Sequence, residues 1–153
     1  MRELILINGP NMNMLGYREN SLYGDKSLSQ IEASLEDFLK VKNVALRSFQ
    51  SNFEGEIINY LQECYLKEFE GKIKTVALIV NLAAFTHTSI AIFDSLTLFT
   101  SLNIPIYEVH LSNIFAREDF RKKSFVSPIA KSVIAGFGHD GYLFAAKHAT
   151  EHL

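Results

Sequence analysis

Five apolar segments alternate along the chain with longer segments that have helical periodicity. Leu4–Asn8 and Thr75–Asn81 are continuous apolar runs, which is the pattern of strands buried on both faces of a sheet. Three more strands are predicted over Val44–Phe49, Ile104–His110 and Ser132–Phe137.

Capping residues and apolar spacing predict helices between these strands. Ser27 and Gln30 fit a capping box at the start of a helix over Ser29–Lys42, and Ser51 and Glu54 fit a second box. The helix predicted behind the second box carries apolar residues at helical spacing: Ile57, Ile58, Leu61 and Tyr65.

Three further helices are predicted in the second half of the chain. Thr88 or Ser89 is the expected cap of a helix that carries Ile92, Phe93, Leu96 and Phe99. A short charged helix is predicted over Ala116–Lys123 and a terminal helix over Tyr142–Glu151. On the terminal segment, His148 and His152 are expected to be exposed.

Strands that alternate with helices indicate an α/β fold with a parallel sheet covered on both sides. Five strands favour the flavodoxin-like, doubly wound order 2-1-3-4-5. The chain has 153 residues, and one core commonly spans ~100–200 residues. We therefore expect residues 1–153 to form a single domain.

The composition excludes several protein classes. With 48% hydrophobic residues, the chain has too much apolar mass to be mainly disordered. A net charge of −2 argues against a nucleic-acid partner, and no apolar run reaches the ~18–20 residues of a membrane span. Cys64, the one cysteine, allows neither an internal disulfide nor a cysteine-ligated zinc site. No signal peptide is visible, so we expect a cytoplasmic protein.

Polar side chains gather where the predicted strands end. Ligands of open parallel sheets bind beyond the carboxyl ends of the strands. The polar residues at these ends are Asn8, Asn11, Asn81, His87, Glu108, His110 and Ser112. The fifth strand ends in Gly136-Phe137-Gly138. Any one of these residues could be a simple loop former, but four strands that together bring amides, imidazoles and a hydroxyl to one edge favour a binding site.

A glycine motif follows the fifth strand. Gly136 to Gly141 fits the pattern G-x-G-x-x-G, but the dinucleotide fingerprint needs a following strand and an acidic residue ~20 positions further on. Only twelve residues remain after Gly141. We therefore predict a tight turn that lets the backbone approach a ligand.

Three arginines lie near the same predicted edge. Arg18 follows the first strand, and Arg117 and Arg121 share a helix face after the fourth. These side chains could belong to a solvated surface, or they could bind an anion. A small carboxylate ligand would account for the arginines together with Ser112. A metal site is not expected, because His87 and His110 lack a partner at ligand spacing.

Five segments of the chain resemble the signature motifs of the type II 3-dehydroquinate dehydratase family. The matching segments are Leu6–Gly24, Phe49–Gly55, Asn81–Ser89, Glu108–Arg121 and Gly136–Tyr142. The resemblance implies a flavodoxin-like enzyme of the shikimate pathway that converts 3-dehydroquinate to 3-dehydroshikimate. It also implies an anti elimination through an enolate, without cofactor or metal.

The resemblance further implies roles for five catalytic residues. Tyr23 matches the base that removes a proton from C2, and Arg18 matches the cation that favours its tyrosinate form. His110 matches the acid that protonates the departing C1 hydroxyl, with Glu108 orienting it. Asn11 matches the residue that helps to hold a water against the enolate oxygen.

Substrate-binding residues are implied in the same way. Asn81, His87 and Arg121 match groups that bind the substrate hydroxyls. The backbone of Leu111 and Ser112 matches the clamp for the substrate carboxylate.

The resemblance also implies a moving loop and an oligomer. Gly16–Asp25 is expected to be a mobile lid, and Arg117 matches the arginine that supports it. Asp94 matches an acid offered by a neighbouring subunit, within a dodecamer built from trimers.

The chain departs from the family pattern at a few positions. Leu82 stands where proline is usual, and Met12 and Met14 replace the commoner leucines.

None of the ten lysines falls in the motifs at the strand ends, which disfavours a Schiff-base route. The alternative is a non-catalytic flavodoxin-like module that binds a small carboxylate, and such a module would need neither Tyr23 nor His110.

Overall fold

The structure is a computed structural model that describes residues 2–151 and 153, so His152 lies outside the described residues. One sheet holds five parallel strands in the order β2-β1-β3-β4-β5. The strands are β1 (Arg2–Asn8), β2 (Ala45–Gln50), β3 (Lys74–Asn81), β4 (Ile106–His110) and β5 (Ser132–Ala135). The predicted α/β class and the order 2-1-3-4-5 are confirmed.

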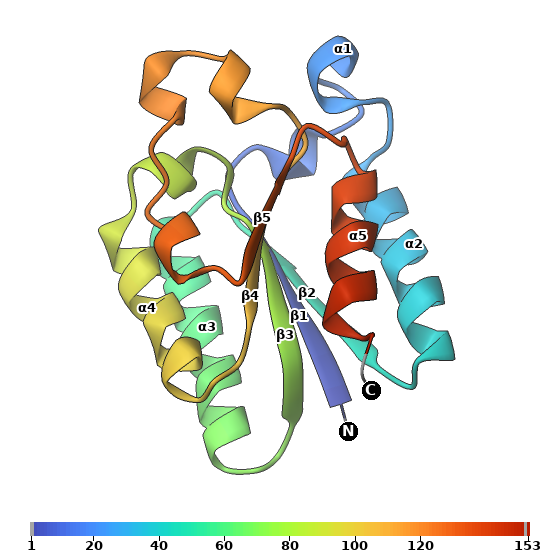
Figure 1. Ribbon diagram of the computed structural model, residues 1–153, viewed down its shortest axis with the longest axis vertical. Coiled ribbons are helices and arrows are strands. Elements are labelled where there is room, and N and C mark those ends of the chain that lie inside the picture. The colour runs from blue at the N-terminus through green and yellow to red at the C-terminus, as the bar shows by residue number, and fades with distance from the viewer. Residues whose placement is uncertain (1, 152) are drawn as a thin grey trace.

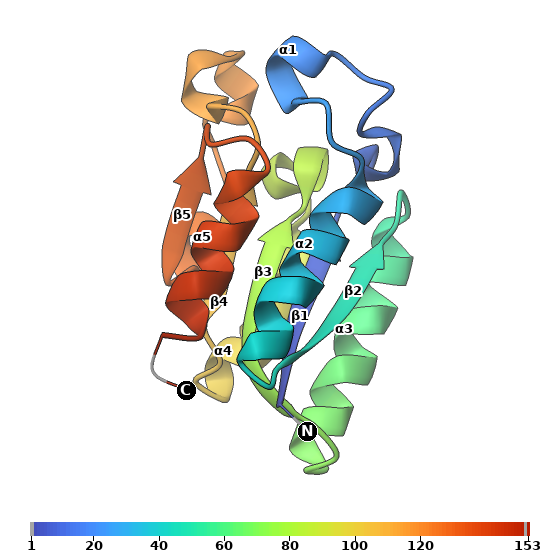
Figure 2. The same cartoon turned by 90° about the vertical axis from the view of Figure 1, so that its right-hand side faces the viewer.

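Helices cover both faces of this sheet (Figure 1). α2 (Leu28–Val41) and α5 (Asp140–Ala149) lie on one face, and α3 (Glu54–Phe69) and α4 (Ile90–Ser101) lie on the other. Figure 2 shows the one-turn helix α1 (Asn20–Tyr23) beyond the end to which the strands point. Among the described residues, no helix has the length and apolar character needed to cross a membrane.

The core has two layers because side chains alternate across each strand. Leu4 and Leu6 of β1 pack toward α2 and α5, whereas Ile5 and Ile7 pack toward α3 and α4. All four are fully buried. The same alternation directs Asn8, the last residue of β1, toward the α5 side.

Two predicted helix starts are confirmed. Ser27 and Gln30 form the capping box of α2. Ser89, rather than Thr88, caps α4, and its hydroxyl accepts a hydrogen bond from the Ile92 N–H at 2.9 Å.

The predicted capping box at Ser51 is wrong. α3 begins at Glu54 with Phe53 at the cap position, two residues after Ser51, so Ser51 cannot cap it. The Ser51 hydroxyl instead accepts from the Phe53 N–H at 2.9 Å and bonds to Glu56.

The predicted helix over Ala116–Lys123 is also wrong. One 3₁₀ turn, Ile114–Ala116, ends where this segment begins, and a second, Asp119–Arg121, lies within it. The backbone between them is extended at Arg117, with φ −105° and ψ −160°, so no helix passes through that residue. Further 3₁₀ turns lie at Met12–Met14, Ala83–His87 and Ser127–Ile129.

Candidate active site

A cavity of about 100 Å³ lies beyond the carboxyl ends of β1, β3 and β4. Its walls come from the loops after these three strands. Residues that line it are Pro10, Asn11, Met12, Arg18, Tyr23, Asn81, Ala83, Ala84, His87, His110, Leu111, Ser112, Ile114, Arg117 and Arg121. In Figures 1 and 2, α1 and the segment after β4 both lie at this end of the sheet.

Close backbone contact joins the loops after β1 and β3. Gly9 donates its N–H to the Asn81 carbonyl at 2.8 Å, and a Cβ on Gly9 would lie 2.1 Å from the Leu82 carbonyl oxygen. Only glycine fits there. Leu82 has φ −75°, an angle that proline also adopts, so leucine preserves the backbone direction at this position.

Glu108 and His110 form a buried pair at the end of β4. They are two residues apart and therefore share a face of the strand, and His110 Nε2 donates to Glu108 Oε1 at 2.7 Å. Ser124 and Ser127 also donate to the carboxylate, at 2.8 and 2.5 Å. Burial alone would raise the pKa of Glu108, but the hydrogen bonds from His110, Ser127 and Ser124 outweigh it and hold the pKa below its ordinary value.

His87 lies beside this pair. Its ring is nearly parallel to that of His110, with the ring centroids 6.2 Å apart. Nδ1 lies 2.6 Å from the Lys123 carbonyl oxygen, which can only accept, so Nδ1 carries the proton and Nε2 is an acceptor. Burial is the main cause that lowers the pKa of His87, and this favours the neutral ring.

A single loop, Lys123–Ser127, therefore holds both imidazoles. Its first carbonyl binds His87, and its two serines bind the carboxylate behind His110. Phe125 donates its N–H to the Thr86 carbonyl at 3.0 Å, which fastens the loop to the turn that carries His87.

Arg18 and Tyr23 meet in the loop that leads from β1 to α2. The Arg18 guanidinium donates to the Tyr23 hydroxyl at 3.5 Å and lies 4.5 Å from the ring centroid. Arg117 approaches the same ring at 5.5 Å and donates to the Ser112 hydroxyl at 3.4 Å. Two cations therefore surround one phenol.

Asn11 and Arg121 extend the polar wall. Asn11 has φ 67°, a left-handed conformation that asparagine tolerates better than most residues. Its N–H is bound by Asn52 Oδ1 at 2.8 Å. Arg121 pairs with Glu118 at 2.8 Å.

The Gly136–Gly141 turn supports the cavity from behind rather than lining it, in contrast to the predicted approach to a ligand. Gly136 and Gly138 both have positive φ, at 88° and 56°. Gly138 donates its N–H to the Leu111 carbonyl at 3.0 Å, so the turn fixes the chain directly after His110.

Comparison with known proteins gives the family. The family model described as "Dehydroquinase class II" matches residues 2–150. The chain belongs to the class II dehydroquinase family. It is 46% identical to a 3-dehydroquinate dehydratase of Endomicrobium trichonymphae over 96% of each chain. It is 48% identical to one of Prochlorococcus marinus, over 95% of this chain and 92% of that one.

A solved class II dehydroquinase also has this fold. The type II dehydroquinase of Butyrivibrio crossotus superposes with a TM-score of 0.86 at 37% identity, with 97% of each chain covered. The family resemblance inferred from the sequence motifs is therefore confirmed.

Ten of the twelve site residues that the motifs imply for a class II dehydroquinase line this cavity. Glu108 is buried behind His110 and reaches the cavity only through it. Asp94 is exposed on α4 and is not among the lining residues. The structure therefore brings eleven of the twelve into one connected group.

Sequence reasoning missed several residues that hold the side chains of this cavity in place. Ser124 and Ser127 lie in a loop without a recognisable pattern, and the Lys123 carbonyl has no sequence signal at all. Asn8 was noticeable as a polar end of an apolar strand. Tyr142 closes the last family motif, but the motif alone assigns it no role.

Proposed function

We propose that this chain converts 3-dehydroquinate to 3-dehydroshikimate by anti elimination of water through an enolate intermediate. The observation that carries the proposal is one cavity that holds both an arginine-flanked tyrosine and a carboxylate-bound histidine. Such a pair can take a proton at one carbon and give one to a leaving hydroxyl at the next. Relatives named 3-dehydroquinate dehydratase support the same reaction.

The first step removes a proton from C2. Tyr23 takes this proton as its phenolate, and Arg18 at 3.5 Å stabilises the negative oxygen beforehand. The C2–H electron pair moves toward the C3 carbonyl and forms the enolate. Asn11 helps to hold a water against the enolate oxygen.

The second step expels the C1 hydroxyl as water. The electron pair of the enolate forms the C1–C2 double bond while the C1–O bond breaks. His110 gives the departing oxygen a proton, and Glu108 stabilises the imidazolium that provides it. After each turnover Tyr23 releases its proton to solvent and His110 takes one up from solvent. The atoms therefore balance without a cofactor.

The remaining polar groups bind the substrate. Asn81, His87 and Arg121 contact its hydroxyls, and the backbone of Leu111 and Ser112 binds its carboxylate. Arg117 is well placed to support the loop that carries Tyr23, since it lies 5.5 Å from the Tyr23 ring.

We further infer a single catalytic domain over residues 1–153, active in the cytoplasm as a dodecamer built from four trimers. Asp94 is exposed on α4, as a residue offered to an adjacent subunit must be. Co-assembly of Asp94→Ala and Tyr23→Phe chains should restore activity, because some sites then hold both intact residues. Inactive mixed oligomers would contradict this assignment.

The reaction itself is tested with 3-dehydroquinate. Incubation should produce the ultraviolet band of the conjugated enone, and substrate deuterated at C2 anti to the C1 hydroxyl should give unlabelled product. Borohydride added with substrate should leave the activity unchanged. Retained deuterium would contradict the anti geometry, and a reduced substrate adduct on a lysine would contradict the enolate route.

A further inference from the structure

A buried chain of hydrogen bonds runs beneath the cavity from Asn81 to Asn8 through the hydroxyl of Tyr142. Asn81 Nδ2 donates to the Tyr142 hydroxyl at 2.9 Å, and that hydroxyl donates to Asn8 Oδ1 at 2.6 Å. Tyr142 and Asn8 are 0% exposed and Asn81 is 3% exposed. Of these three residues, Asn81 lines the cavity.

Strand geometry brings the two amides together. Asn8 and Asn81 end neighbouring parallel strands and lie opposite each other in the β1–β3 register. Each follows a buried residue two positions earlier that faces α5, namely Leu6 and Ile79, so both amides face α5 as well.

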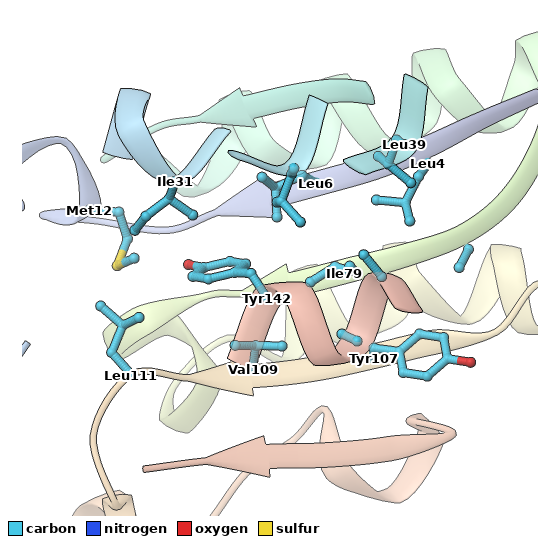
Figure 3. Close-up of a cluster of buried hydrophobic side chains, with 14 of the residues drawn as sticks. Leu4, Leu6, Met12, Ile31, Leu39, Ile79, Tyr107, Val109, Leu111 and Tyr142 are labelled. Carbon is cyan, nitrogen blue, oxygen red and sulfur yellow. The ribbon is translucent and has the colours of Figure 1, made fainter. Parts of the chain in front are cut away.

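The first turn of α5 packs closely against the sheet. A Cβ on Gly141 would lie 3.2 Å from the Ile134 side chain and 3.3 Å from that of Val109, so α5 approaches the sheet where it has no side chain. Figure 3 shows the Tyr142 hydroxyl directed toward Met12 and Leu111, and both of these residues line the cavity.

One backbone group fixes the direction of each hydrogen bond between Asn81, Tyr142 and Asn8. The Ala83 N–H can only donate, and it donates to Asn81 Oδ1 at 3.2 Å. Asn81 must therefore turn Nδ2 toward Tyr142, whose single proton then goes to Asn8. Within residues 2–151 and 153, Asn8 Nδ2 is buried without a hydrogen-bond partner.

Because Asn8 Nδ2 is left without a partner, the orientation of the Asn8 amide serves the hydrogen bond from the Tyr142 hydroxyl to Asn8 Oδ1. Reversing the Asn8 amide would leave the Tyr142 proton without its acceptor, so the amide of Asn8 is set by the hydroxyl. Tyr142 engages one hydrogen of Asn81 Nδ2, and in the part of the chain that the structure describes the second hydrogen has no other partner.

We propose that Tyr142 is a positioning residue for the dehydration reaction. Its hydroxyl locks the Asn81 amide so that an N–H, and not the amide oxygen, is presented to an oxygen of the substrate. This inference rests on the proposed function, because it concerns how that substrate is bound. Without the hydroxyl, the Asn81 amide loses one of the two contacts that determine its orientation.

Tyr142→Phe tests the proposal because it keeps the buried ring and removes only the hydroxyl. The KM for 3-dehydroquinate should rise about tenfold, the effect of one lost oriented hydrogen bond, while kcat stays within about twofold.

The matched control is Tyr107→Phe. Tyr107 is also buried, and its hydroxyl binds His148 of α5 at 2.8 Å, but Figure 3 shows that hydroxyl pointing to the opposite end of the sheet. The control should lower the melting temperature without changing KM.

A double-mutant cycle with Asn81→Ala separates positioning from general destabilisation. If Tyr142 acts through Asn81, Tyr142→Phe should have no further effect on KM once the Asn81 amide is gone. Additive effects would overturn the proposal, and so would a KM in Tyr142→Phe equal to that of Tyr107→Phe. An inactive wild-type chain would instead contradict the proposed function.

A second variant serves if Tyr142→Phe does not fold. Asn8→Ala removes the acceptor that directs the Tyr142 proton away from Asn81, so KM should rise by a smaller factor of about threefold. A folded Asn8→Ala protein with unchanged KM would overturn the proposal.

Discussion

The proposed acid and base sides of the cavity are built in different ways. Glu108 and His110 are 1% and 4% exposed, lie on a strand, and are joined by a hydrogen bond of 2.7 Å. Ser124 and Ser127 donate to the same carboxylate at 2.8 and 2.5 Å. Tyr23 and Arg18 are only partly buried. They lie on a loop and a one-turn helix, and the hydrogen bond between them is 3.5 Å long.

Under the proposed mechanism, this difference means that the acid half of the chemistry is organised before the substrate arrives. A strand inside a sheet holds its side chains in place at all times, so the acid side needs no ligand to assemble. A loop that closes on substrate can exclude water and complete the site only when it is needed. We therefore expect the acid side to contribute to fold stability and the base side to respond to ligand.

Removing the base should have the largest effect on catalysis. Tyr23→Phe keeps the ring between Arg18 and Arg117 but removes the group that accepts the proton. Steady-state kinetics should show kcat reduced by about 10²–10⁴-fold, with inhibitor binding largely retained. Tyr17→Phe, at an 85% exposed position of the same loop, is the control and should be unchanged. A Tyr23→Phe enzyme with near-normal kcat would place the base elsewhere.

Removing the acid should divide the reaction into its two steps. His110→Ala should reduce dehydration by about 10²-fold or more, yet still exchange the C2 proton with solvent, because Tyr23 remains. Proton NMR of the substrate in deuterium oxide measures that exchange. His148→Ala, on exposed α5 surface, is the control. Unimpaired dehydration by the His110 variant would remove this residue from its proposed role.

The strand-borne half of the site was the easier half to predict. Apolar runs that end in Asn8, Asn81 and His110 indicate both the strands and the edge where ligands bind, because strand periodicity and parallel topology are local and general. The loop of Arg18 and Tyr23 has no such periodicity. Its one-turn helix was not predicted, and the family motif alone brought those residues into the site.

The two errors in the sequence prediction have different physical causes. Ser51 satisfies a local helix rule, but its hydroxyl binds the nearby Phe53 N–H and Glu56 instead of capping the helix. The segment Ala116–Lys123 also satisfies local helix rules, but partners more distant in the sequence determine its conformation. Arg117 has an extended backbone where its side chain reaches Ser112 and the Tyr23 ring. Ser127 reaches Glu108 across 19 positions of sequence, a contact that no local pattern encodes.

Weakening the support of Glu108 should lower stability in a pH-dependent way. Ser127→Ala removes one of three donors to this buried carboxylate, which should cost about 1.5–3 kcal/mol at pH 7. Ser127 is the better choice than Ser124, whose hydroxyl also accepts from two backbone N–H groups.

The pH dependence follows from the lowered pKa of Glu108. Because the pKa in the folded state lies below the ordinary 4.5, the stabilisation is complete above that value and is lost as pH falls below it. The difference in melting temperature between wild type and Ser127→Ala should therefore shrink below pH 4.5. Ser95→Ala, which removes a buried hydroxyl that donates to the neutral carbonyl of Ala91, should show a difference independent of pH. A constant difference for Ser127→Ala would mean that the serine does not stabilise the charged carboxylate.

Protection of the Gly16–Asp25 loop by a ligand is the smallest effect expected. It is also the most direct test of whether the base side is more mobile than the acid side. Gly16 and Gly24 have φ of 89° and 85°, so glycine hinges flank Arg18 and Tyr23. Trypsin should cleave the free protein after Arg18, and saturating product should slow that cleavage about tenfold as the loop closes. Lys72 is exposed in the loop between α3 and β3, at the opposite end of the strands, and supplies an internal control site whose cleavage should not change.

The acid side gives the complementary expectation. Trypsin should not cleave after Lys123 with or without product, because the Lys123 carbonyl and the following residues are bound to His87, Thr86 and Glu108. Cleavage after Arg18 at equal rates in free and saturated enzyme would show that the base side is as fixed as the acid side.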